Sequence, residues 1–438
     1  MQISEKDEGS LAAEQVIEKK ASGIGRTFAA LRHRNFRLFW CGQLISLIGT
    51  WMQTTGQSWL VLQLTKDAWA LGIVGALQFL PVMLLSLFGG VLADRLPKRR
   101  MLLFTQSFAA IQATILWVLV ATNTVQLWHV YILAFLLGLT NAFDMPTRQA
   151  FVVEMVGRED LPNAIALNSS LFNMARIVGP GLGGLIIAWQ GEASLFLLNA
   201  ISFIPVIAGL ALIDLKQLHS QVNHKRRELQ QGTFQSLREG LSYIRQAPAV
   251  LLIIVVIGTV SLFGINFNVV LPLFATDVLH AGPAGFGFIS SAFGFGSLLS
   301  ALWLAWRSNR PTISHMLLAT IIFCVLEMLF ALSHWYVLSL GLIAAVGFAQ
   351  IAFSATANTT IQTISPDHLR GRIMSVYMLV FAGSVPLGNL FTGGLASQFN
   401  PTVALLAGGG LSLIAAVAGW ILRAPAEKAV AEYTYVQE

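Results

Sequence analysis

The stretch GGVLADRLPKRR, residues 89–100, places one acid and then four cations at the end of a long apolar run. Two glycines stand near the end of this run, just before Asp94 and Arg95. The sequence on either side is apolar over lengths that can cross a lipid bilayer, which takes about 20 helical residues. Charge concentrated between two such segments predicts a short loop at a membrane surface.

The composition extends this interpretation to the whole chain. Of its 438 residues, 55% are hydrophobic and 11% are charged, whereas a soluble domain carries about 25% charged residues. Apolar runs of membrane-crossing length fill the sequence from Leu38 to Leu422. We therefore expect an integral membrane protein.

Twelve apolar runs separated by polar breaks predict twelve membrane-spanning helices. A polar segment, residues 214–248, divides these runs six and six, and residues 234–244 within it have the spacing of an amphipathic surface helix. The predicted spans are roughly 38–64, 69–93, 101–121, 127–146, 162–189, 193–213, 249–276, 284–306, 313–333, 335–361, 371–398 and 402–422. The predicted organisation is an N-terminal segment (1–37), a six-helix bundle (38–213), a central loop (214–248), a second six-helix bundle (249–422) and a tail (423–438).

The distribution of Lys and Arg predicts the orientation in the membrane. Of the 27 such residues, 25 lie on alternate predicted loops and the two termini, and the exceptions are Lys66 and Arg176. Because cytoplasmic loops retain Lys and Arg, both termini are expected to be cytoplasmic in a multi-pass protein of the cell membrane. The formal net charge of +6 then reflects topology, so no nucleic-acid partner is expected.

The two predicted bundles also resemble each other in sequence. The stretch beginning VGREDLPNAIALN (156–168) parallels ISPDHLRGRIMSV (364–376), with Leu161 matching Leu369 and Ile165 matching Ile373. Repeated six-span halves are typical of transporters that work by alternating access.

The charged stretch carries a recognisable pattern, G-x-x-x-D-R-x-x-(K/R)-R. Its positions are filled by Gly90, Asp94, Arg95, Lys98 and Arg99. Twelve spans in two sixes with this pattern between spans two and three resemble the major facilitator superfamily. The sequence departs from that family at residue 97, where proline replaces the usual glycine and stiffens the turn.

Further stretches resemble one branch of that superfamily. G-P-x-x-G-G in span five, formed by Gly179, Pro180, Gly183 and Gly184, is similar to the signature of proton-coupled drug antiporters. LRHRNFRLFWCGQLISLIGTWMQ (31–53) and FDMPTRQAF (143–151) resemble the branch that contains the enterobactin exporter and macrolide efflux pumps. The resemblance, over residues 30–423, implies an all-α fold of twelve transmembrane helices in two pseudo-symmetric six-helix bundles.

The resemblance also implies a gate at the charged stretch. Asp94 is expected to face the N-terminus of span eleven near Gly371, where free N–H groups favour an anion. Arg95 or Arg99 would then pair with Asp144, so that a latch holds the cytoplasmic gate shut. The expected gate partners are Asp144, Arg148, Arg370 and Gly371. The alternative is that these cations only anchor the topology.

Span five offers two further hypotheses. Its glycines allow a close contact between helices, and this contact could seal the two halves or be ordinary membrane packing. Arg176 lies one turn earlier, where a buried cation is costly. It either bonds backbone carbonyls freed by Pro180 or meets an anionic group of the substrate.

A polar stripe in span one predicts a substrate cavity. Ser46, Thr50, Gln53 and Gln57 share one helical face, and the resemblance implies that spans one, four, seven and ten line the cavity. The candidate cavity residues are Gln53, Gln57, Asn266, Asn268 and Gln350. The alternative for each is a hydrogen bond between helices.

One acid, Glu327, lies well inside a span. A buried carboxylate can carry a proton, which makes Glu327 a candidate coupling residue. The resemblance places it on a peripheral helix, which weakens that hypothesis.

These patterns favour a secondary active transporter that exports a hydrophobic or amphipathic small molecule in exchange for protons. The sequence has no phosphate-binding G-x-x-x-x-G-K-[ST] loop and no metalloprotease or nucleophile motif, so we expect no enzyme activity, no cofactor and no metal. The expected partners are the substrate, protons and the bilayer, and the expected state is a monomer. The alternatives are an importer or lipid translocator of the same fold, or a membrane sensor that does not transport.

Overall fold

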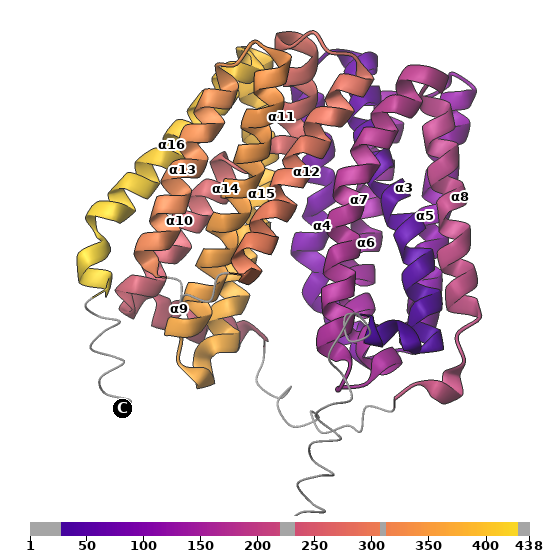
Figure 1. Ribbon diagram of the computed structural model, residues 1–438, viewed down its shortest axis with the longest axis horizontal. Helices are drawn as coiled ribbons and strands as arrows, with labels where there is room; N and C mark the ends of the chain where they lie inside the picture. The colour runs from indigo at the N-terminus through magenta and orange to yellow at the C-terminus, as the bar shows by residue number, and fades with distance from the viewer. Residues whose placement is uncertain (1–27, 220–232, 307–311, 428–438) are drawn as a thin grey trace, which may run out of the picture.

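The computed structural model describes residues 28–219, 233–306 and 312–427. These residues form helices and connecting turns and contain no strand. Figure 1 shows two groups of long helices side by side, one built from the first half of the chain and one from the second. The predicted all-α membrane fold is confirmed in its class.

The first half begins with a short 3-10 helix, Ala29–Arg32, and is followed by a second, Leu215–Gln217. Its long helices are α3 (Arg34–Thr65), α4 (Ala68–Arg95), α5 (Lys98–Ala121), α6 (Leu127–Val156), α7 (Leu161–Gln190) and α8 (Glu192–Ala211).

The second half follows a shorter connecting helix, α9 (Thr233–Gln246). Its helices are α10 (Pro248–Phe263), α11 (Phe267–Leu273) with a π-helical turn (Phe274–Val278), α12 (Pro283–Trp306), α13 (Ile313–Ala331), α14 (Tyr336–Ile364), α15 (Asp367–Gln398) and α16 (Pro401–Ile421).

Helix pairing repeats between the two halves. In the first half α3 contacts α7 and α8, α6 contacts α4 and α5, and α5 contacts α8. In the second half α10 contacts α15 and α16, α14 contacts α12 and α13, and α13 contacts α16. The helices of the two halves therefore pack in the same order, as the internal sequence repeat predicts.

Eleven helices of the described residues are long and apolar enough to cross a membrane. The first predicted span, α3, is not among them, although its 32 residues are long enough. Gln43, Gln53 and Gln57 lower its hydropathy, and all three side chains are buried in the folded chain. The count of twelve spans and the domain boundaries stay predictions. Parts of the predicted termini and of the predicted central loop lie outside the described residues, namely residues 1–27, 220–232 and 428–438.

The predicted span 249–276 matches the apolar stretch Pro248–Val278, and the structure shows that its helix is broken between α10 and α11. Helix α10 ends at Phe263, and the Asn266 side chain donates to the Leu262 carbonyl at 2.8 Å. That side chain satisfies a carbonyl that a continuing helix would have bonded. Pro272, inside α11, has no N–H to donate, and the π-helical turn follows directly.

The two ends of the helical bundle differ in charge. The end that carries Lys98, Arg148 and Arg372 is called the cationic end, and the end that carries Lys66 and Asp67 is called the opposite end. Helix α9 lies at the cationic end, where Glu239 forms an ion pair with Arg372 at the start of α15. The predicted amphipathic helix is therefore present, and it packs on α15 and α10.

Candidate transport site

The two halves meet at the opposite end through glycines. Helix α4 contacts α15, and α7 contacts α12. A Cβ atom placed on Gly72 would lie 2.7 Å from the Asn389 carbonyl oxygen, and one on Gly184 would lie 2.4 Å from the Pro283 carbonyl oxygen. Real Cβ atoms do not approach so closely, so the backbones of the two halves touch here.

Two hydrogen bonds join the halves in the same region. The Ser291 hydroxyl of α12 donates to the Ile177 carbonyl of α7 at 2.6 Å. The Ser397 hydroxyl near the end of α15 donates to Asp67 Oδ1, just before α4, at 2.7 Å. Glycine contacts and polar contacts thus close the opposite end.

The span-five glycines serve two different contacts. Gly179 and Gly183 face α3 of their own half, where an added Cβ would lie 2.5 Å from Trp51 Cβ and 3.3 Å from Met52 Cα respectively. Only Gly184 of the four motif residues presents its missing side chain to the other half. Pro180 contributes its carbonyl oxygen, which would lie 2.5 Å from a Cβ on Gly287 of α12.

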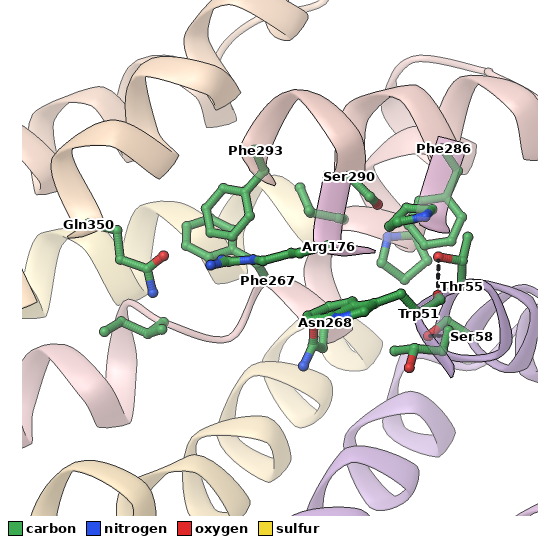
Figure 2. Close-up of a pocket in the computed structure, with 15 residues that line it drawn as sticks. Trp51, Thr55, Ser58, Arg176, Phe267, Asn268, Phe286, Ser290, Phe293 and Gln350 are labelled. Carbon is green, nitrogen blue, oxygen red and sulfur yellow. Dashed lines mark hydrogen bonds between the residues drawn. The ribbon is translucent and has the colours of Figure 1, made fainter. Parts of the chain in front are cut away.

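A cavity of about 180 Å³ lies between the halves (Figure 2). Its walls come from α3 and α7 on one side and from α11, α12 and α14 on the other. Asn268 lies in the first turn of α11, just after the break, and lines the cavity. Irregular backbone at membrane depth is tolerated where it lines such a cavity. The lining residues include Trp51, Ser58, Asn268, Phe286, Ser290 and Gln350.

Arg176 lies among these side chains (Figure 2). Its guanidinium carbon sits 4.9 Å from the centre of the Phe293 ring, a cation–π contact worth about 2 kcal/mol when desolvated. The guanidinium makes no hydrogen bond or ion pair within the described residues, and no acidic residue lines the cavity. Pro180 lacks the N–H that would bond the Arg176 carbonyl, but the Arg176 side chain does not bind freed carbonyls in this structure.

The structure separates the predicted cavity residues. Asn268 and Gln350 line the cavity, and Gln57 lines a smaller neighbouring cavity beside Asn268. Gln53 instead donates to Gln112 at 3.1 Å and accepts from Asn199 at 2.5 Å, which ties α3 to α5 and α8. For Gln53 the alternative of hydrogen bonding between helices describes this structure, whereas Asn266 caps the end of α10.

The lining face of α3 lies one residue beyond the predicted stripe. Trp51, Thr54, Thr55 and Ser58 line the cavity, and they share one face through the spacing i, i+3, i+4 and i+7. One residue turns a helix by about 100°, which explains why Ser46 and Gln53 point into the first half. The aromatic residues that line the cavity, such as Trp51 and Phe286, were not predicted from the sequence. Trp51 is followed by several hydroxyl-bearing residues in α3, and this pattern could have indicated a lining face.

At the cationic end, Asp144 is bound inside the first half. It accepts from Thr105 at 2.7 Å and from Gln106 at 2.8 Å, and it forms an ion pair with Arg148 one turn along α6. The predicted partner Arg99 instead donates to the Leu210 carbonyl at 2.7 Å and the Ala211 carbonyl at 2.5 Å.

Lys98 also pairs within the first half. Its Nζ lies 2.7 Å from Glu154 Oε1. Lys98 and Arg99 of the charged motif therefore bind other helices of their own half, and neither reaches α15.

The predicted latch is not formed in this structure. Asp94 and Arg95 are exposed and make no hydrogen bond or ion pair within the described residues. Nothing lies within 4 Å of a Cβ placed on Gly90 or on Gly371. Arg370 pairs with Asp367 on its own helix at 2.6 Å. The ends of α4 and α15 are thus apart here, while their other ends touch.

Glu327 lies away from the cavity. It is buried on α13, and its Oε2 atom has no hydrogen-bond partner within the described residues. The same atom would lie 3.4 Å from a Cβ on Gly409 of α16. The described residues contain no group of three or more metal-ligating side chains.

Comparisons with known proteins agree with this architecture. The family described as "transmembrane secretion effector" matches residues 25–436. The multidrug efflux pump Tap of Mycolicibacterium fortuitum is 31% identical over 77% of this chain and 83% of its own length. The staphyloferrin A transporter of Staphylococcus aureus is 25% identical over 83% of this chain and 90% of its own. Among solved structures, the nucleoside transporter NupG has a TM-score of 0.70 at 15% identity, over 89% of this chain and 99% of its own.

Proposed function

The chain belongs to the transmembrane secretion effector family of the major facilitator superfamily, and from this premise we propose that it exports drug- or siderophore-like molecules in exchange for protons. Its function as a membrane transporter in this family follows from relatives that are efflux pumps and a siderophore transporter. We propose in addition that transport runs outward and that it is coupled to protons.

One observation carries the proposal: a cavity between the halves lies beneath a closed opposite end, while the gate residues at the cationic end stand apart. A transporter of this kind exposes one central site alternately to each side of the membrane. We infer that the described conformation is the one that opens toward the cationic end. With the termini cytoplasmic, it would load its cargo from the cytoplasm.

Glycine spacing supports a second conformation. Gly90 follows Gly72 by 18 residues (90 − 72), and Asn389 follows Gly371 by 18 residues (389 − 371). This spacing is about five turns at 3.6 residues per turn. Gly90 thus lies on the face of α4 that contacts α15, and Gly371 lies on the matching face of α15. Rocking the halves would bring the two glycines together and Asp94 to the start of α15.

Proton coupling needs a carboxylate that binds and releases a proton during the cycle. Inside the spans, Asp144 is held by Arg148 and two hydrogen-bond donors, whereas Glu327 Oε2 has no partner within the described residues. Glu327 is therefore the coupling candidate, acting through the contact of α13 with α16. Proton release per cargo molecule should vanish in Glu327→Gln while cargo still binds, and unchanged coupling in this variant would remove Glu327 from the mechanism.

The proposal is tested by efflux from cells that lack their own pumps. Cells preloaded with the macrolide erythromycin or with a carboxylate siderophore should lose at least one of them faster when they express this chain. A proton uncoupler should abolish this difference in the rate of cargo loss. Cells expressing Gly184→Leu control for the effect of producing a membrane protein of the same size. Faster uptake would show an importer instead, and equal retention across the panel would contradict export.

A further inference from the structure

We propose that the central cavity selects amphipathic anions, and that Arg176 binds the carboxylate or phosphate head group. The inference rests on the proposed function only in treating the ligand as cargo. The binding site itself is argued from the cavity.

The charge of Arg176 has no counter-charge in the cavity. None of the lining residues is acidic, and Arg176 forms no ion pair within the described residues. The buried carboxylates Asp144 and Glu327 are elsewhere, since Asp144 pairs with Arg148 at the cationic end and Glu327 does not line the cavity. A cation at membrane depth is costly, so a ligand that supplies the missing negative charge binds with a large electrostatic advantage.

The geometry leaves the donors of the guanidinium available. The guanidinium carbon lies 4.9 Å from the centre of the Phe293 ring, and the N–H edge of the guanidinium makes no hydrogen bond within the described residues. That edge presents donors in a fork that matches the two oxygens of a carboxylate or phosphate. Figure 2 shows the guanidinium beside Phe293 and Phe267, in the middle of the lining side chains.

The rest of the lining suits an amphipathic body. Trp51 and Phe286 offer aromatic faces, and the side chains of Asn268, Ser290 and Gln350 make no hydrogen bond within the described residues. Ligand sites typically combine an apolar wall with a few such polar groups. The volume of about 180 Å³ is below the roughly 300 Å³ of drug-sized sites, so this conformation holds a head group with one ring system.

The test compares charged thiol reagents at a cysteine beside Arg176. The full chain carries Cys41→Ser and Cys324→Ser to remove its own cysteines, together with Ser290→Cys, and is purified in detergent so that both ends are accessible. The anionic reagent MTS-ethylsulfonate should react faster than the cationic MTS-ethyltrimethylammonium, after correction for their rates with free cysteine. Adding Arg176→Gln should lower that ratio by about tenfold, as expected for loss of a nearby unit charge.

The control is Arg158→Gln, which removes an exposed cation in the loop before α7 and should leave the ratio unchanged. Arg176→Lys should keep most of the preference, because it retains the charge. A ratio that is the same with arginine or glutamine at position 176 would overturn the inference. Circular dichroism and a monodisperse elution profile check that Arg176→Gln is folded.

A protection experiment then identifies the head group. 1-Naphthylacetate or 1-naphthyl phosphate should slow labelling of Ser290→Cys at concentrations at least about tenfold below those at which the neutral 1-naphthylacetamide does so. The better anion identifies carboxylate or phosphate as the preferred head group, and Arg176→Gln should remove the advantage of both. Equal protection by anion and amide, or no protection by either anion, would overturn the assignment. These readouts need no transport, so anion selectivity can hold while the export assay fails, and the reverse.

Discussion

The two ends of the helical bundle hold their helices together in different ways. At the opposite end the halves touch backbone to backbone, with Gly72 against Asn389 and Gly184 against Pro283. At the cationic end the charged residues Lys98, Arg99 and Asp144 bind only within the first half. Close contact between halves therefore comes from small residues, while the charges stabilise each half.

This difference shows how the molecule can move. A glycine contact between halves has few specific bonds to break, so it can open and re-form with modest changes in free energy. We expect the pairs within each half to be kept in both conformations, so that each half moves as a rigid body. Substitutions between the halves should change which conformation is populated, and substitutions that break a pair within a half should lower stability without changing that population.

The largest effect is expected for Gly184→Leu. Overpacking of a tight contact costs about 1–3 kcal/mol, and each 1.4 kcal/mol changes a ratio of states about tenfold. The opposite end should open, so an impermeant thiol reagent should reach Ser290→Cys from outside the cell, and export should collapse.

Two matched variants sharpen this result. Gly410→Leu on α16 adds the same bulk where nothing lies within 4 Å, and it should export normally. Gly183→Leu presses on α3 of the same half, so it should lower the thermal stability without changing which end is accessible. If Gly184→Leu behaves like Gly410→Leu, the glycines do not form a functional seal.

A smaller effect is expected for Asp94→Asn. Asp94 has no partner in the described conformation, so only the conformation with a closed cationic end should lose an interaction, worth about 0.3–2 kcal/mol for a carboxylate at a helix N-terminus. Export should fall, and a cysteine introduced by Gly371→Cys should label faster from the side of the cationic end. Glu159→Gln, an exposed acid at the same end, is the control, and equal behaviour of the two variants would reduce the motif to a topology anchor.

The smallest effect is expected for Glu154→Gln, which breaks the Lys98 pair inside the first half. The side chains of this pair are 15% and 19% exposed and thus partly buried, but Gln keeps an oxygen that can accept from Lys98, so we expect a cost of about 1 kcal/mol. The melting temperature should fall slightly while the labelling of Ser290→Cys from either side stays the same. A change in accessibility would contradict the division between contacts within and between the halves.

The fold was largely predictable from the sequence, because apolar runs and the alternation of Lys and Arg report local properties. The site was predictable only in part. Asn268, Gln350 and Arg176 were found, but the lining face of α3 was displaced by one residue, and the break near Asn266 was missed. Both errors concern tertiary context. The sequence does not show which face of the polar helix α3 meets the other half, nor that the Asn266 side chain replaces a backbone hydrogen bond at the end of α10. The pairing of Asp144 with Arg148 follows i, i+4 spacing, whereas contacts between halves have no local signal.

Alternating closure of the two ends is tested most directly by cross-linking Gly90→Cys to Gly371→Cys in a chain carrying Cys41→Ser and Cys324→Ser. A disulfide requires Cα atoms within about 7 Å, so it can form only when the cationic end closes. We predict that oxidation of membranes cross-links the pair, stops export until a reductant is added, and leaves the cavity open to reagents from the opposite side. A pair that never cross-links during active transport, or a cross-linked protein that still exports, would contradict the account.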